Sequence, residues 1–233
     1  MKAQANANLA IVASLVSEGS RAAMLIAMLD GRFHPASELA YMAGIKPQTA
    51  SFHLSKMTDA GIVSVEQQGR HRYYGIRDPE VARMLESLLS IAPPVEIKSL
   101  RQADEDRAIR SARTCYDHLA GKLGIQLTTS LLEMGVLDEN HKQFEVTAAG
   151  EAFFRDFRLD LDRARAKRRS FSHKCLDWSE RRHHLAGSLG SVLLEKMLEL
   201  KWIERLPKTR AVRVTEKGKK GFKATFGIDV EGR

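Results

Sequence analysis

The sequence has few cysteines and no long apolar run. Two cysteines in 233 residues exclude a disulfide-stapled scaffold and are typical of a reducing compartment. No apolar stretch approaches the roughly 18 residues that a membrane-spanning helix needs. Residues 9–16 are apolar and follow Lys2, but a single charge, a short stretch and no small-residue cleavage pattern argue against a signal peptide. We therefore expect an amphipathic helix there and a cytoplasmic protein.

Motifs of the common enzyme classes are also missing. The sequence holds no P-loop, no dinucleotide-binding fingerprint, no nucleophile elbow and no paired metal-protease histidines. We therefore predict that the chain is not an enzyme. One enzymatic alternative stays open, in which Cys115 and His118, or His183 and His184, are the reactive groups.

Positive charge exceeds negative charge. The chain carries 37 Lys and Arg against 29 Asp and Glu, which gives a formal net charge of +8. Such an excess favours a polyanionic partner such as nucleic acid. At about 150 residues per domain, the length allows one large domain or two small ones.

The first third of the chain has the pattern of several helices followed by a hairpin. Apolar residues recur at helical spacing in four stretches, 9–17, 20–30, 37–43 and 47–60. Strand-like alternation follows at 62–67 and 71–76 around a turn, and Asp78-Pro79 opens another helix. Pro93-Pro94 then breaks the chain. We expect the domain boundary there, between an N-terminal domain of residues 1–92 and a C-terminal domain of residues 93–233.

The predicted helix over 47–60 has two different faces. Ala50, Leu54 and Met57 recur at i, i+4 and i+7 and form a buried side. The opposite face is mostly polar and presents Gln48, Thr49, Ser51, Phe52, Ser55 and Lys56, with His53 near its edge. The hairpin tip carries Arg70, His71 and Arg72. Such a helix fits the major groove of double-stranded DNA, and basic residues on a hairpin suit phosphates or the minor groove.

These motifs occur in the same order in one known family. The runs Ala50-Ser-Phe-His-Leu-Ser-Lys-Met57, Ala60-Gly-Ile-Val63 and Gly69-Arg-His-Arg-Tyr-Tyr74 resemble the ArsR-type winged helix-turn-helix repressors of bacteria, over roughly residues 9–91. The resemblance implies a homodimer, formed through the first and last helices of the domain, that represses transcription at a pseudo-palindromic operator. It also implies that Gln48, Thr49, Ser51 and His53 contact bases or phosphates, and that Phe52 touches a thymine methyl.

Two familiar metal sites of that family are missing. Metal-sensing members often carry a Cys-x-Cys pair on the first helix of the motif, but Glu38-Leu-Ala-Tyr-Met-Ala43 has no cysteine. Others bind zinc through Asp and His on the closing helix, but residues 80–91 contain neither. We therefore expect any signal to be read by the long C-terminal domain.

The C-terminal domain contains an internal sequence repeat. His118-Leu-Ala-Gly-Lys-Leu-Gly124 reappears 66 residues later as His184-Leu-Ala-Gly-Ser-Leu-Gly190, and Val146-Thr-Ala-Ala-Gly150 reappears 68 residues later as Val214-Thr-Glu-Lys-Gly218. This predicts a tandem duplication, with two related units at about 110–157 and 175–226, each a helix–helix–strand–helix unit. The first helix is expected over about 96–119. The predicted fold is mainly α with short β-hairpins: a winged helix-turn-helix and a helical C-terminal domain with an internal duplication.

Both cysteines lie in this domain, each upstream of a histidine. On a helix, Cys115 and His118 share a face, and with Cys175 and His184 they form a candidate metal or effector site. Zinc, haem and a thiol redox switch are all compatible with these residues, as is plain burial of small hydrophobic cysteines, so the cofactor is left open. The spacings of three and nine residues differ, which predicts that the cysteines are not equivalent in the two copies.

The sequence therefore predicts a DNA-binding transcriptional regulator. We expect a repressor whose C-terminal domain responds to a small molecule, a metal or a redox signal. The alternative to an effector-controlled regulator is a constitutive architectural DNA-binding protein without a ligand.

Overall fold

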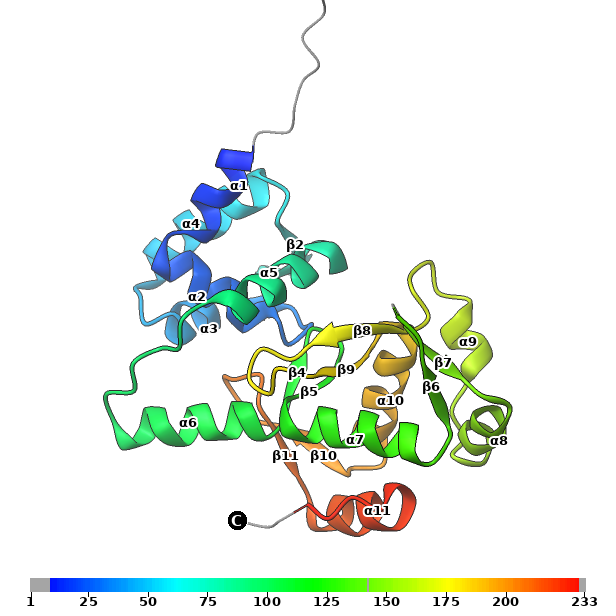
Figure 1. The fold of residues 1–233 in the computed structure, drawn as a ribbon. Helices are drawn as coiled ribbons and strands as arrows, with labels where there is room; N and C mark the ends of the chain where they lie inside the picture. Colours follow the sequence, from blue (N-terminus) through cyan, green and yellow to red (C-terminus); the bar gives the residue numbers. More distant parts are fainter. Residues whose placement is uncertain (1–8, 142, 231–233) are drawn as a thin grey trace, which may run out of the picture. The chain divides into compact units, whose positions relative to one another are not determined.

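The computed structural model describes residues 9–141 and 143–230, and the chain divides into two compact units, Met1–Leu85 and Glu86–Arg233 (Figure 1). The division falls inside helix α5 (Pro79–Ile91), ahead of the expected boundary at Pro93-Pro94. Glu86 accounts for this, because it is buried in the second unit and accepts a hydrogen bond of 2.5 Å from Arg210.

The first unit contains helices and a small antiparallel sheet. Its elements are α1 (Leu9–Val16), α2 (Gly19–Met28), β1 (His34–Pro35), α3 (Ala36–Met42), α4 (Pro47–Asp59), β2 (Val63–Gln68), β3 (His71–Ile76) and the start of α5. The sheet order is β1-β3-β2. This order of elements is the winged helix-turn-helix, with α3 and α4 as the helix-turn-helix and β2–β3 as the wing.

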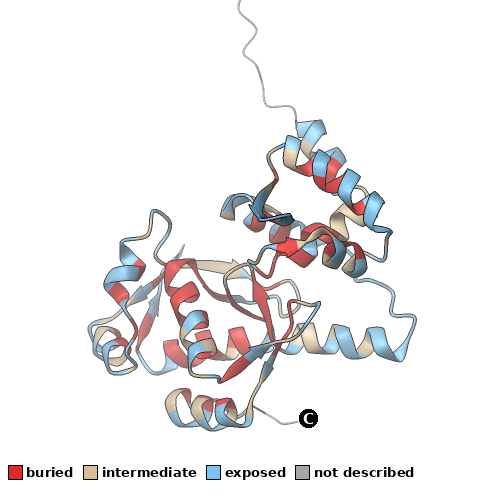
Figure 2. Cartoon of the chain, turned by 180° about the vertical axis from the view of Figure 1, so that it is seen from behind, coloured by how far each residue is buried: buried red, intermediate tan, exposed pale blue. Residues whose placement is uncertain are grey.

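The sequence determines where α4 and the wing end. Pro47 stands in the first turn of α4, where its missing N–H costs no hydrogen bond. Gly61 follows the helix with a φ of +74°, and Gly69 turns the wing with a φ of +59°. Both values lie in the left-handed region that glycine adopts without strain. The core of the unit is apolar, and Figure 2 shows buried residues in red. Its fully buried members include Met24, Leu25, Met28, Leu39, Leu54 and Met57.

The second unit consists of α6 (Leu100–Ser111) followed by two runs with the same order of elements, hairpin, helix, hairpin, helix. The first run is β4 (Arg113–Cys115), β5 (His118–Ala120), α7 (Gly121–Glu133), β6 (Leu137–Glu139), β7 (Phe144–Val146) and α8 (Ala148–Asp156). After α9 (Leu161–Arg165), the second is β8 (His173–Leu176), β9 (His183–Ala186), α10 (Gly187–Glu199), β10 (Ile203–Arg205), β11 (Val212–Val214) and α11 (Glu216–Phe226).

The expected helix over 96–119, and with it the helix–helix–strand–helix unit, is wrong. Helix α6 begins after its N-cap Ser99 and ends at Ser111, and the chain then pairs with itself as β4–β5. Gly121, the first residue of α7, has a φ of +76° and turns the chain from the hairpin into the helix. The apolar residues in this stretch have helical spacing, and strands of only three residues are too short to give a contrary pattern.

The two runs pack against each other in a crossed manner. Helix α10 lies on β5 of the first run, and α7 lies on β9 of the second. Gly190 and Gly124 permit this, because a Cβ on Gly190 would lie 3.0 Å from the Cβ of His118, and one on Gly124 would lie 3.8 Å from that of His184.

Among the described residues, no single helix has the length and apolar character to cross a membrane. Of the described helices, only α1 and α2 taken together are long and apolar enough, and the two are bent by 87° relative to each other.

Candidate DNA-reading surface and candidate metal centre

Helix α4 presents a continuous exposed face. Ala50, Leu54 and Met57 are buried, as their spacing predicts. The exposed side chains are Gln48, Thr49, Ser51, Phe52, Ser55 and Lys56. The Lys56 ammonium lies 4.4 Å from the centre of the Phe52 ring, and Phe52 itself is 57% exposed. An aromatic ring left in solvent beside a cation is available for an apolar contact with a base.

His53 does not belong to this face, and its place as a candidate DNA contact needs correction. Its side chain is buried, with Nδ1 3.2 Å from an Arg21 guanidinium nitrogen and Nε2 3.6 Å from a Glu18 oxygen. Glu18 also accepts the backbone N–H groups of Ser20 and Arg21 and so caps α2. These contacts hold α4 against the start of α2, so His53 acts through the position of the helix.

The wing lies beside α4 and is basic at its tip. Arg70, His71 and Arg72 are all exposed. A groove between α4 and the wing is lined by Ser51 and Ser55 on one side and by the three tip residues on the other. The groove therefore joins hydrogen-bonding side chains on a helix to cationic side chains on a hairpin.

In the second unit, the hairpins bring both Cys–His pairs into matching positions. Cys115 is directly opposite His118 in β4–β5, and Cys175 is directly opposite His184 in β8–β9. The expectation that Cys115 and His118 share a helix is wrong, and so is the expectation that the cysteines are not equivalent. Two residues separate Cys115 from His118 and eight separate Cys175 from His184, so the sequence spacing differs while the strand pairing is the same.

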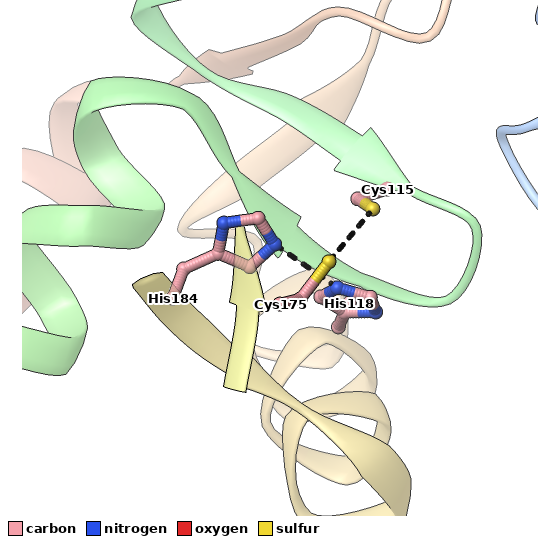
Figure 3. Close-up of side chains that lie close together, drawn as sticks. All are labelled: Cys115, His118, Cys175 and His184. Carbon is pink, nitrogen blue, oxygen red and sulfur yellow. Dashed lines mark hydrogen bonds between the residues drawn. The ribbon is translucent and has the colours of Figure 1, made fainter. Parts of the chain in front are cut away.

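The four side chains converge on one point (Figure 3). The two sulfur atoms lie 3.8 Å apart and the two Nε2 atoms lie 3.1 Å apart. All four potential ligand atoms lie within 4.8 Å of one another. Cys115, His118 and His184 are buried, and Cys175 is partly buried.

Each histidine has a carboxylate behind it. His118 Nδ1 lies 3.4 Å from Asp117, and His184 Nδ1 lies 3.2 Å from Asp177. Asp177 is fully buried and also accepts hydrogen bonds from Arg113 and from the Gly121 amide. Burial alone would raise the pKa of Asp177, but hydrogen bonding to His184 and the Arg113 charge hold that pKa far below its usual range. Asp177 is therefore ionised.

The metal-free cluster has strongly shifted pKa values. Hydrogen bonding to Cys175 and burial raise the pKa of the Cys115 thiol well above its usual range. Burial lowers the pKa of His118, but Cys115 and Asp117 outweigh it and raise that pKa to about 10. Clustered groups with perturbed pKa values are a feature of functional sites.

One signal in the sequence identifies this arrangement. Cys115-Tyr-Asp117 and Cys175-Leu-Asp177 share the pattern Cys-x-Asp, and each precedes His-Leu-Ala-Gly. If residues 178–183 are treated as an insertion in the second copy, the Cys, Asp and His of one copy align with the Cys, Asp and His of the other. The contact of Glu18 and Arg21 with His53 has no comparable pattern in the sequence.

Comparison with known proteins identifies the chain. Residues 16–66 match the model of a helix-turn-helix domain. The Bacillus subtilis protein YdfF, an uncharacterized HTH-type transcriptional regulator, is 50% identical over 225 residues, which are 97% of this chain and 100% of that protein. The chain belongs to the HTH-type transcriptional regulators. It is a DNA-binding regulator of the helix-turn-helix type, as its motifs predict.

Two further similarities cover less than half of the regulator. The HTH-type transcriptional regulator CmtR of Mycobacterium bovis is 31% identical over 88 residues, 38% of this chain and 74% of CmtR. The homodimeric winged helix-turn-helix DNA-binding domain of a possible ArsR-family regulator, also from Mycobacterium bovis, is 21% identical with a TM-score of 0.35 and covers 42% of this chain and 100% of that domain.

Proposed function

We propose that this regulator recognises a specific operator through α4 and clamps the flanking backbone with its wing. The observation that carries the proposal is the exposed face of α4 beside the basic wing tip, with one groove between them. Gln48, Thr49 and Ser51 offer hydrogen bonds to base edges, and Phe52 offers an apolar contact to a thymine methyl. Arg70, His71 and Arg72 at the wing tip contact phosphates, and so does Lys56 on α4.

The start of α4 adds a phosphate site. Lys46, the N-cap residue, makes no side-chain hydrogen bond to the first turn of the 13-residue helix. The free backbone N–H groups and the helix dipole there favour an anion. A phosphate at this point orients the helix in the groove while the side chains of Gln48 and Thr49 reach the bases.

The regulator acts as a homodimer in this proposal. Helix α1 has the sequence LAIVASLV, yet Leu15 is its one buried residue, and Leu9 and Ile11 are 76% and 54% exposed. A mostly apolar helix that the chain itself leaves uncovered is explained by a second copy that packs on it. A dimer then places two copies of α4 about one helical turn of DNA apart, roughly 34 Å, over a pseudo-palindromic operator. Such a regulator works where the chromosome is, in the cytoplasm.

The second unit supplies the signal. We propose that it arose by tandem duplication, because both runs have the same order of elements and equivalent Cys, Asp and His positions. An effector that binds there and prefers one dimer geometry shifts the population of dimers able to place both α4 helices in adjacent grooves. The regulator is then a repressor that its effector releases from DNA.

Operator binding by the full-length dimer tests the proposal. Fluorescence anisotropy with the duplex upstream of the regulator's own gene measures affinity against an unrelated duplex of equal length. We expect the Thr49→Ala, Ser51→Ala double variant to lose roughly 10-fold or more of its operator affinity, at about 1–3 kcal/mol for each good base contact. Ser111→Ala, an equally exposed hydroxyl at the end of α6, is the matched control and retains full affinity.

Two results would contradict the proposal. Equal affinity of the double variant and the control excludes α4 as the reading surface. Equal affinity of the wild-type regulator for operator and unrelated DNA points instead to an architectural protein without sequence preference.

A further inference from the structure

We propose that the second unit binds one zinc ion through Cys115 Sγ, His118 Nε2, Cys175 Sγ and His184 Nε2, and that this ion clamps the two duplicated hairpins together. This site differs from the two familiar metal sites of ArsR-type repressors, whose ligand residues this sequence lacks.

Two of the distances between the ligand atoms, sulfur to sulfur and nitrogen to nitrogen, match those of a tetrahedral ion. With Zn–S near 2.3 Å and Zn–N near 2.0–2.1 Å, tetrahedral angles set the S···S distance at about 3.8 Å and the N···N distance at about 3.3 Å. The structure has 3.8 Å between the sulfurs and 3.1 Å between the Nε2 atoms. Two sulfur and two nitrogen donors in a tetrahedron select zinc over the harder divalent cations.

The histidines are oriented as metal ligands are. Asp117 and Asp177 lie 3.4 Å and 3.2 Å from the two Nδ1 atoms, where a carboxylate favours the ring proton on Nδ1 and leaves Nε2 to bind a metal. The two Nε2 atoms meet 3.1 Å apart inside the unit. In the metal-free unit, a proton on one Nε2 is donated to the other as a hydrogen bond. Zinc takes the place of this proton and accepts the lone pairs of both nitrogens.

Charge also favours the ion. Two thiolates balance the charge of Zn²⁺, so the loaded centre is neutral although three of its four ligands are buried. Behind it, the Asp177 carboxylate has its own counter-ion in buried Arg113, at 2.9 Å. Loading therefore releases protons from the ligands, and the loaded centre itself carries no net charge.

The ligands come in equal numbers from the two hairpins, which indicates a structural role for the ion. One Cys and one His come from β4–β5, and the other pair comes from β8–β9. Four protein ligands leave no open position for a substrate, which is typical of structural zinc. The ion therefore connects the two runs, and its binding free energy adds to the stability of the second unit.

Metal content of the full-length chain tests the site. Protein purified with a thiol reductant and reconstituted with Zn²⁺ should hold one zinc per chain by mass spectrometry of the metal. Reconstitution with Co²⁺ should give the visible bands and sulfur-to-cobalt charge-transfer absorption of a tetrahedral site with thiolate ligands. A chelator should lower the unfolding temperature of the wild-type protein, and added zinc should restore it.

A neighbouring pair of histidines provides a matched control. His183 is exposed on the same strand as His184. Mutation of a residue that only hydrogen-bonds to a metal ligand lowers metal affinity by about 10–100-fold. We therefore expect loss of a ligand itself, in His184→Ala, to weaken zinc binding by more than roughly 100-fold. His183→Ala should bind as the wild type does, and Cys175→Ser should lose the charge-transfer band.

Several outcomes would overturn the proposal. These are a reduced wild-type protein that takes up neither zinc nor cobalt, equal metal binding by His184→Ala and His183→Ala, or a cobalt spectrum without thiolate bands. A Cys115–Cys175 disulfide as the native state, with no metal after reduction, would also overturn it. Since metal content is measured without DNA, failure here is distinct from failure of operator recognition.

Discussion

The imidazole rings of His118 and His184 meet at their Nε2 atoms, 3.1 Å apart, although 66 positions separate them in the chain. Each is the strand partner of a cysteine, and each has an aspartate of its own hairpin at Nδ1. A repeated sequence thus supplies two half-sites, and the crossed packing of α7 and α10 brings them together. The first unit has a different architecture, in which one helix and one hairpin present their residues to solvent.

Removal of charge from the wing tip should change the salt dependence of DNA binding. The Arg70→Ala, Arg72→Ala variant should lower the slope of log affinity against log salt concentration by about 1 for each phosphate that the wing no longer neutralises. Arg77→Ala is the control, since Arg77 follows β3 at the far end of the hairpin and is also exposed. An unchanged slope in the double variant would show that the wing does not touch the DNA.

The cap of α2 should make the first unit sensitive to acid. Hydrogen bonds from the Ser20 and Arg21 amides lower the pKa of Glu18 to about 2, from 4.5. A group whose pKa is lowered on folding stabilises the fold above its unfolded pKa, and this contribution is lost as pH falls from about 4.5 to 2. Thermal unfolding between pH 6 and 2 should show the loss. Glu18→Gln should flatten the profile in that window, and an identical profile would contradict the assignment.

The buried pair of Arg113 and Asp177 should be costly to break. Both side chains are fully buried, and Asp177→Ala leaves the guanidinium charge without its carboxylate counter-ion. We expect a loss of about 3–5 kcal/mol in the free energy of unfolding of the second unit, measured by denaturant titration. Asp229→Ala, which breaks the exposed pair with Lys223, should leave that free energy unchanged. Equal effects of the two variants would show that the buried pair has no special role.

Gly190 should tolerate no side chain. A Cβ there would lie 2.8 Å from the Leu185 carbonyl oxygen and 3.0 Å from the Cβ of His118. Gly190→Ala should therefore destabilise the second unit by about 1–3 kcal/mol and weaken zinc binding, because His118 must shift. Gly19→Ala has open space at its Cβ and should have little effect on either. Full stability and full zinc affinity of Gly190→Ala would disprove the close approach.

The first unit was predictable from the sequence because its signals are local. Helical spacing, Pro47 at a helix start and Gly61 and Gly69 at left-handed positions each fix an element without reference to the rest of the chain. His53 shows the limit of this reasoning. Its place on the helical wheel is at the edge of the polar face, and only the contact with Arg21 and Glu18 decides that it is buried.

The second unit was harder to predict because its key strands are three or four residues long. Such strands are specified by their partners across the hairpin, and the sequence around Cys115 and His118 is equally compatible with a helix. The loop between Cys175 and His184 then hid the equivalence of the two pairs. The strand pairing, which only the folded structure shows, reveals that the two Cys–His pairs are equivalent.

Operator recognition at the level of single base pairs tests the central claim most directly. The measurement compares wild type and Ser51→Ala on a set of operator duplexes, each with one base pair changed. If α4 reads base edges, the variant should lose about 1–3 kcal/mol of discrimination at one position of each half-site and keep its discrimination elsewhere. Identical discrimination by the two proteins at every position would contradict the account.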